Sequence, residues 1–305
     1  MSAPTESDQA LKRGQAENFD GLNDVLAGTP FDKHLRFFNF GYRPLEGEDP
    51  VGPTLGPLFP NKESAQLLFQ LIGDADLTDR DVVEVGCGRG GNLWLADRYF
   101  GAGQAIGLDI AHRSMVYAAT TGQPPGAQFV QADAERLPLA DASADVVLNV
   151  ETSCTYPDLA SFLLEVARIL RPGGWFLYTD LLDRRLFEPL KAALDTAGFD
   201  LVTERDITPN VQASRNARAE RQKLAFVATD GDARSATFDE FVADTGSTLA
   251  RYLEGEERIY HILRLRKRDV PATTEPLFDE ADTALIRECA AETVRLLDLS
   301  TPSPA

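Results

Sequence analysis

Apolar and polar residues follow two different patterns in the middle of the chain. Between residues 81 and 207, short apolar runs, which indicate buried strands, alternate with stretches in which apolar residues recur every three or four positions, which indicate amphipathic helices. The strands are predicted at 81–85, 104–109, 127–131, 144–150, 175–180 and 199–207, and the helices at 92–99, 112–120, 160–170 and 185–197. This alternation predicts an α/β protein with a parallel sheet and right-handed crossovers.

The flanking segments are predicted to add helices and one further strand. Residues 1–30 are polar, so we expect them to be disordered or only partly helical. The alternating segment 258–268 is expected to be a last strand at or near a sheet edge, where its charges are tolerated. The predicted organisation is an N-terminal extension and lid segment (1–60), a main domain (61–268) with a helical cover insert (209–251), and a C-terminal helix and tail (269–305).

The charge and the cysteines limit the partners that we expect. A net charge of −18 leaves no basic footprint for a phosphate backbone, so we predict no nucleic acid partner. No apolar run approaches the ~18 residues of a membrane span, and no signal pattern precedes the fold, so we predict no membrane insertion. Three isolated cysteines without a CxxC pair fit a reducing cytoplasm and argue against a metal site.

The most informative segment is Val-Val-Glu-Val-Gly-Cys-Gly-Arg-Gly-Gly-Asn at 82–92, where a short strand enters a glycine cluster that opens a helix. Gly86, Gly88 and Gly91 satisfy the G-x-G-x-x-G pattern, and Asp109 follows at the end of the second strand. Glycine lets backbone approach a ligand closely because it lacks a Cβ atom. A nicotinamide cofactor and another nucleoside cofactor would both place Asp109 on a ribose diol.

Charge around this loop separates the two interpretations. Glu84 lies on the strand before the glycines, and a carboxylate there suits a cofactor with a cationic end and no phosphates. A pyrophosphate would favour basic neighbours, and only Arg89 is a nearby candidate. Asp133 follows the third strand, where it can accept a hydrogen bond from an adenine amino group.

This set of features, together with Leu-Arg-Pro-Gly-Gly at 170–174, resembles the class I S-adenosylmethionine-dependent methyltransferases. Further segments look like the phthiotriol dimycocerosate methyltransferase group, and the resemblance covers about residues 35–268; the segments are 84–92, 107–109, 129–135, 148–153, 206–211 and 249–255. It implies a Rossmann-like fold with a mostly parallel seven-stranded sheet and a helical substrate-cover insert. It also implies S-adenosylmethionine as cofactor, S-adenosylhomocysteine as product, and methyl transfer to a hydroxyl or carbon of a small apolar polyketide, lipid or terpenoid-like acceptor.

The resemblance also implies which residues form the site. Cofactor-binding positions would be Glu84, Gly86, Gly88, Gly90, Asn92, Asp109, Ile110, Asp133, Ala134 and Asn149. Glu151 is a candidate base or partner of the cofactor ammonium, and Tyr156 is a candidate aromatic group near the reacting atoms. Tyr42 would cover the methionine end or pack in the core, and His34 would be a base if the N-terminal segment folds over the pocket. Cys154 occupies the position of a histidine in that group, which leaves the proton-removal step unassigned.

Three other functions remain open at this level. The same fold can hold a cyclase that does not methylate its substrate, an NAD-dependent oxidoreductase or a binding protein that only retains the cofactor site. The sequence does not identify the acceptor or the oligomeric state, and a homo-oligomer with a swapped N-terminal segment is compatible with it.

Overall fold

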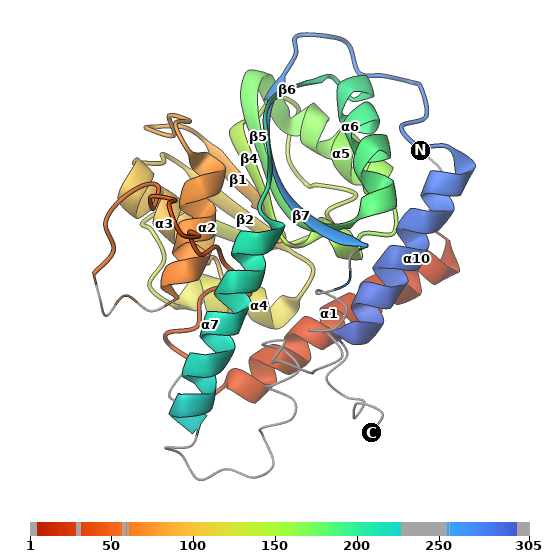
Figure 1. The fold of residues 1–305 in the computed structure, drawn as a ribbon. Helices are drawn as coiled ribbons and strands as arrows, with labels where there is room; N and C mark the ends of the chain where they lie inside the picture. Colours follow the sequence, from red (N-terminus) through yellow and green to blue (C-terminus); the bar gives the residue numbers. More distant parts are fainter. Residues whose placement is uncertain are drawn as a thin grey trace.

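The computed structural model of the chain describes residues 5–28, 32–56, 59, 61–226, 255 and 257–297; for residues 219–226 it describes only the backbone. Its sheet has the strand order β3-β2-β1-β4-β5-β7-β6 (Figure 1). The strands are β1 (Val82–Val85), β2 (Ala105–Asp109), β3 (Gln128–Gln131), β4 (Ala144–Val150), β5 (Leu170–Asp183), β6 (Phe199–Asp206) and β7 (Arg258–Lys267). The first five are parallel, and β7 pairs antiparallel with both β5 and β6. The predicted mostly parallel, seven-stranded sheet is therefore confirmed.

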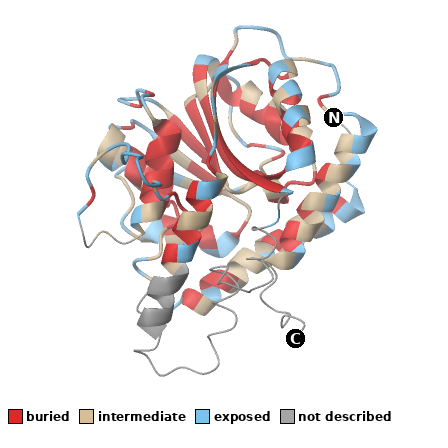
Figure 2. Cartoon of the chain, viewed as in Figure 1, coloured by how far each residue is buried: buried red, intermediate tan, exposed pale blue. Residues whose placement is uncertain are grey.

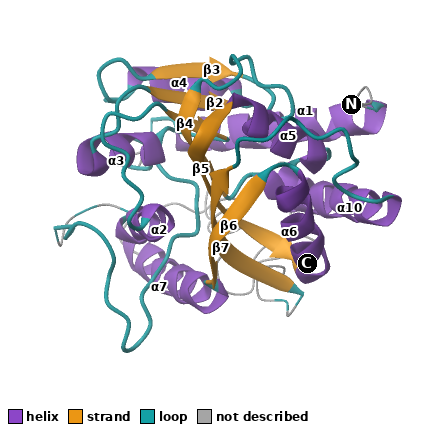
Figure 3. Ribbon diagram, turned by 90° about the horizontal axis from the view of Figure 1, so that it is seen from above, coloured by secondary structure: helices purple, strands orange, loops and turns teal. Residues whose placement is uncertain are grey.

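Helices cover both faces of this sheet, and the central strands are consequently buried on both sides (Figures 2 and 3). One face packs against α2 (Lys62–Ile72), α3 (Gly91–Phe100) and α7 (Thr208–Phe226), whereas α5 (Leu159–Ile169) and α6 (Phe187–Thr196) cover the other. The helix α4 (His112–Thr120) packs on β2 and β3. Burial on two sides explains why β1 reads as an unbroken apolar run apart from Glu84.

The N-terminal region differs most from the prediction. Residues Glu6–Leu26 form a 21-residue helix, α1, which opens with a capping box between Thr5 and Asp8. The buried side of α1 is largely polar, so no apolar period marks it as a docked helix; its buried residues are Asp8, Gln15, Leu22, Asn23 and Leu26. It runs below the carboxyl ends of the strands and lies beside α10 (Glu280–Leu296), which descends along the side of the sheet (Figure 1).

The structure describes the whole of the last strand but only the first part of the predicted cover insert. The strand β7 lies one position in from the edge strand β6, so the prediction "near an edge" holds and "at an edge" does not. The helix α7 forms the start of the predicted cover insert, and residues 227–251 of that insert lie outside the described residues. In the part of the chain that is described, no helix is long and apolar enough to cross a membrane.

Candidate active site

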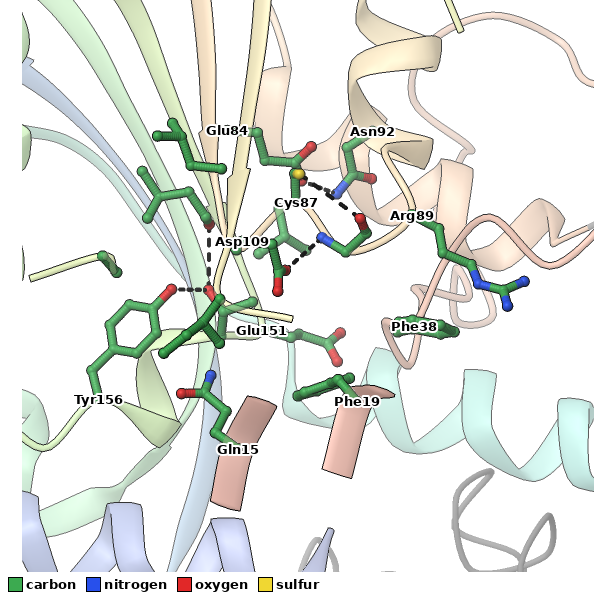
Figure 4. A pocket seen from close by; sticks show the side chains of 18 of the residues that line it. Gln15, Phe19, Phe38, Glu84, Cys87, Arg89, Asn92, Asp109, Glu151 and Tyr156 are labelled. Carbon is green, nitrogen blue, oxygen red and sulfur yellow. Dashed lines mark hydrogen bonds between the residues drawn. The ribbon is translucent and has the colours of Figure 1, made fainter. Parts of the chain in front are cut away.

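A cavity opens at the carboxyl ends of the central strands, and it holds about 870 Å³ of space including its mouth (Figure 4). Its walls come from the end of β1 and the glycine loop, the ends of β2 and β4, the loop after β3, the segment 36–39 and the inner side of α1. Ligand sites of parallel α/β sheets form at this end because the strands deliver their following loops to one edge.

The glycine loop is built tightly against its neighbours. Gly86 has φ +74°, and a Cβ atom there would lie 2.5 Å from the side chain of Thr152. The amide of Gly88 donates to Asp109 Oδ2 at 2.8 Å, and the amide of Ala111 donates to Oδ1 at 2.8 Å. Burial raises the pKa of Asp109 even though these amides oppose it. The Asp109 carboxylate is thus fixed beside the loop, with lone pairs left for a ligand's hydroxyl groups.

A second acidic group lies at the base of the cavity. The side-chain amide of Asn92 donates to Glu84 Oε1 at 2.7 Å, whereas Glu84 Oε2 and Asn92 Oδ1 are buried without a hydrogen-bond partner among the described residues. Burial, aided by the charge of Asp109, raises the pKa of Glu84 to about 8. Two buried acceptors without a donor match a ligand that brings a cationic, hydrogen-bond-donating group such as an ammonium.

The cations that line the cavity are engaged by the protein itself. Arg89 extends away from the cavity in Figure 4; its Nε atom donates to Asn23 at 2.8 Å, and its guanidinium lies 4.0 Å from the ring centre of Tyr117. Arg36 donates to the carbonyl of Thr121. The glycine loop therefore presents acids and backbone amides rather than free cations, which fits S-adenosylmethionine better than a pyrophosphate.

The helix α1 forms a wall of the cavity that the sequence did not reveal. Lys12 forms ion pairs with Asp133, at 2.7 Å, and with Glu135. Gln15 donates to Thr155 Oγ1 at 2.6 Å, across 140 positions of sequence. These contacts join polar side chains that carry no periodic signal, so only the tertiary structure brings them to the site.

Glu151 directly follows β4 and has φ +55°, a left-handed conformation that is uncommon for a residue other than glycine. Both carboxylate oxygens accept from the amide of Phe40, at 2.9 and 3.0 Å. Burial raises the pKa of Glu151 to about 8, while contacts with Tyr260 and the charge of Arg218 oppose the shift and Asp180 adds to it. The carboxyl group points into the cavity (Figure 4).

A buried acid beneath Glu151 holds the loop that follows β4. Asp180 Oδ2 accepts from the amides of Thr152 and Cys154, each at 3.1 Å. The same oxygen accepts from the hydroxyl of Ser153 at 2.7 Å. Burial and the charge of Asp180 raise the pKa of the Cys154 thiol well above its usual value. Cys154 therefore stays protonated at neutral pH and does not replace the histidine as a base.

The structure brings most of the predicted site residues together. The cavity is lined by Glu84, Gly86, Gly88, Asn92, Asp109, Ile110, Asp133, Ala134, Glu151 and Tyr156. Gly90 instead caps α3, and Asn149 lies beneath the cavity floor, where its amide donates to Val85 O and Thr152 Oγ1. Tyr260 on β7 contacts Glu151 without lining the cavity, and the strand pattern around it gave no reason to place it near the site.

Two of the proposed catalytic residues are not brought to the cavity. The Tyr42 hydroxyl donates to Glu48 and accepts from Arg205, in a buried position outside the cavity. The interpretation of Tyr42 as a core aromatic therefore describes its position better than that of a lid. His34 is exposed, and its carbonyl accepts from Asn61.

Glu84 gives a first prediction, on the stability of the ligand-free protein. Below pH 4.5 the Glu84 carboxyl is protonated in both the folded and the unfolded chain. Between pH 4.5 and about 8 it is protonated only in the folded chain, so the free energy of unfolding falls as the pH rises through this window. At about pH 8, this difference in pKa lowers the free energy of unfolding by roughly 3–5 kcal/mol. Glu84→Gln removes it, so urea unfolding from pH 5 to 8.5 should show a shallower decline than the wild type. Parallel curves for the two proteins would contradict the assignment.

Comparisons with known proteins agree with this geometry. The model of the methyltransferase domain family matches residues 83–178. The phthiotriol/phenolphthiotriol dimycocerosates methyltransferase of Mycobacterium tuberculosis is 34% identical over 241 residues, which cover 74% of this chain and 83% of that protein. The fatty-acid O-methyltransferase of Mycolicibacterium smegmatis is 38% identical over 177 residues, or 58% of this chain and 64% of that protein, slightly under two thirds of its length.

Solved structures share the fold at lower sequence identity. A 4+2 cyclase superimposes with a TM-score of 0.64 at 21% identity, covering 88% of this chain and 98% of its own. A geranyl diphosphate methyltransferase superimposes with a TM-score of 0.57 at 16% identity; the match covers 84% of this chain and 99% of that protein. At these identities the likeness concerns the fold alone.

Proposed function

Because the chain belongs to the class I S-adenosylmethionine-dependent methyltransferases, we propose that it transfers a methyl group to an oxygen or carbon atom of a small, largely apolar natural product. The relatives' names point to lipid-like acceptors in both cases, a fatty acid and a phthiotriol dimycocerosate. The cofactor of the family is S-adenosylmethionine, which excludes the nicotinamide interpretation of the glycine loop.

The residues of the cavity fit this cofactor. Glu84 and Asn92 offer the buried acceptors that an ammonium requires, and Asp109 offers a fixed carboxylate for the ribose hydroxyls. Asp133 is the proposed acceptor for the adenine amino group, and it now pairs with Lys12. When bound, the cofactor supplies an electrophilic methyl group on a positively charged sulfur.

The protein's contribution to the reaction is orientation and exclusion of water. The helix α1 and the segment that contains Phe37 and Phe38 line one side of the cavity, while the strand ends form the floor. An acceptor held there in line with the methyl group gains from alignment, which is worth up to ~7–11 kcal/mol in favourable cases. Among the described residues, Glu151 and Tyr156 are the polar side chains proposed to face the reacting atoms.

A single observation supports the proposal most strongly: an acidic cavity with an unpartnered carboxylate oxygen, at the strand ends of this fold, that opens toward Glu151. The test is incubation of the full chain with methyl-labelled S-adenosylmethionine and a panel of fatty acids, long-chain alcohols and phenols, followed by mass spectrometry. Methylated product with release of S-adenosylhomocysteine is the expected result. Cofactor binding without label transfer to any acceptor would refute the proposal and favour a cyclase or a binding protein.

A further inference from the structure

A buried amide in the cavity wall has no part in the proposed contacts with the cofactor. Asn39 lines the cavity and is only 6% exposed, yet its side-chain oxygen Oδ1 has no hydrogen-bond partner among the described residues. A buried acceptor without a donor is unfavourable, and buried polar groups are rarely left in that state. An unpaired amide oxygen in a cavity wall therefore indicates a ligand that brings a donor to it.

The main chain around this amide is, in contrast, held on several sides. Arg218 Nη1 donates to the carbonyl of Asn39 at 2.6 Å. The amide of Phe40 donates to Glu151 Oε1 at 2.9 Å, and the carbonyl of Phe40 accepts from the Ser214 hydroxyl at 2.8 Å. The backbone that carries the Asn39 side chain is thus fixed before any ligand binds, which lowers the entropy that binding has to overcome.

The place of Asn39 in the cavity separates it from the residues proposed for the cofactor. The three acids proposed for adenine, ribose and the ammonium lie at or after the ends of β3, β2 and β1, which are consecutive in the sheet. The next strand is β4, which Glu151 follows directly, and the bond from Phe40 ties the chain next to Asn39 to this position. Phe38 and Glu151 both face the cavity in Figure 4. Asn39 therefore borders the part of the cavity that is left for the methyl acceptor.

The polar groups of this region suit a neutral ligand that carries a donor. Burial raises the pKa of Glu151 to about 8, so this carboxyl is mainly protonated at pH 7. A carboxylate ligand would place its oxygens against Asn39 Oδ1 with no hydrogen between them. An O–H or N–H group supplies the hydrogen that this oxygen lacks. Sites built around such a contact reject analogues that lack the donor more strongly than they reject changes in size.

Resting on the proposed function, we propose that Asn39 binds the methyl acceptor, and that its Oδ1 atom accepts a hydrogen bond from an O–H or N–H group of that molecule. An amide oxygen is not basic enough to remove the proton, so this contact orients the polar end of the molecule and selects for it. Phe37 and Phe38 line the same wall and offer apolar area to the rest of the acceptor.

The first test needs no methyl acceptor. Asn39→Leu replaces the amide with an apolar group of similar shape, so the melting temperature should stay unchanged or rise by up to about 5 °C. The Kd for S-adenosylhomocysteine, measured by calorimetry, should stay within about threefold of the wild type. Asn216→Leu, at an exposed position of α7, is the matched control. A lower melting temperature would show that the amide supports the fold, and a larger loss of affinity would assign it to the cofactor; either result would overturn the proposal.

The second test measures the contact itself. Calorimetry on the full chain saturated with S-adenosylhomocysteine would compare dodecanol with its methyl ether, which lacks the donor. The wild type should bind dodecanol about 10- to 100-fold more tightly than the ether. Asn39→Leu should abolish this preference, whereas Asn39→Asp, which keeps an acceptor oxygen, should retain part of it and Asn216→Leu all of it. A wild type without the preference, or an Asn39→Leu variant that keeps it, would overturn the proposal.

Methyl transfer separates the failure of this proposal from that of the proposed function. For the alcohols that the wild type methylates, Asn39→Leu should raise KM by about 10- to 100-fold. Label transfer by the wild type to none of the fatty acids, alcohols and phenols would refute the methyltransferase function. Label transfer with the same KM for alcohols in the wild type and in Asn39→Leu would refute the role of Asn39 alone.

Discussion

Replacing Asp109 with alanine is expected to weaken the binding of S-adenosylmethionine by about 100-fold or more. A fixed carboxylate that accepts two ribose hydroxyls makes charge-assisted hydrogen bonds, each worth about 1.5–3 kcal/mol. The substitution also removes the acceptor for the amides of Gly88 and Ala111, so the glycine loop loses its support at the same time. Isothermal titration calorimetry with S-adenosylmethionine and with S-adenosylhomocysteine measures the loss directly.

Two further variants separate ligand contact from loop support. Asp109→Asn keeps the size of the side chain and one carbonyl acceptor, so its affinity should fall between those of the wild type and the alanine variant. Glu188→Ala, at an exposed position of α6, removes an acid of similar charge far from the cavity and should bind the cofactor normally. Thermal unfolding of each variant checks that the fold persists. A cofactor affinity unchanged in Asp109→Ala would show that the ribose contact is assigned to the wrong residue.

The cofactor side of the site was predictable because its residues are short-range neighbours of strand ends. The glycine loop follows β1 directly, and Asp109 and Asp133 come at or just after the ends of the next two strands. Parallel strands bring such positions to one edge whatever the details of packing. The alternation of strands and helices was predictable for the same reason, since burial on both faces leaves a clear apolar signal in β1 and β4.

The wall formed by α1 could not be predicted, because polar contacts hold it to the rest of the chain. Lys12 and Gln15 meet partners more than 120 positions away, and neither lies in an apolar stripe. Pattern-based reasoning detects faces that bury apolar area, so a helix docked through ion pairs and amides escapes it. Arg89 shows a related limit: its place in the glycine loop gave no indication that its side chain would turn outward to Asn23 and Tyr117.

The catalytic side was the least predictable, because the positions of its groups depend on one another. The sequence left Cys154 open as a base, and only the structure shows that burial, together with the charge of Asp180, raises the pKa of the thiol. His34 and Tyr42 were chosen from residue type and a resemblance; the Tyr42 hydroxyl bonds Glu48 outside the cavity, and His34 is exposed and does not line the cavity. A residue's chemistry in this region follows from burial and charge in three dimensions, which a single sequence does not record.

The second large effect is expected at Asp180, which touches neither the cavity nor the proposed cofactor contacts. Its side chain is fully buried, and its carboxylate accepts from the loop that follows β4 and from the amide of Leu181. Asp180→Ala leaves several buried donors without an acceptor, at about 1–3 kcal/mol each. We therefore expect the free energy of unfolding to fall by about 3–5 kcal/mol, a large part of the ~5–15 kcal/mol that holds a typical domain together.

In the molecules that remain folded, loss of Asp180 should also reduce the rate of methyl transfer by about 100-fold. Glu151 and Tyr156 lie at the two ends of the loop that Asp180 holds, and a displacement of ~1 Å in an active site can lower the rate by about this factor. Urea unfolding measures the first effect, and hydrogen exchange over residues 151–156, together with single-turnover rates, measures the second. Glu204→Ala, at an exposed position of the edge strand β6, removes only a surface ion pair with Lys191, so this control should change the free energy of unfolding by less than about 1 kcal/mol. If Asp180→Ala destabilises the protein but the folded fraction turns over at the wild-type rate, then the loop does not depend on this acid for its catalytic geometry, and the positions of Glu151 and Tyr156 must be maintained by their other contacts.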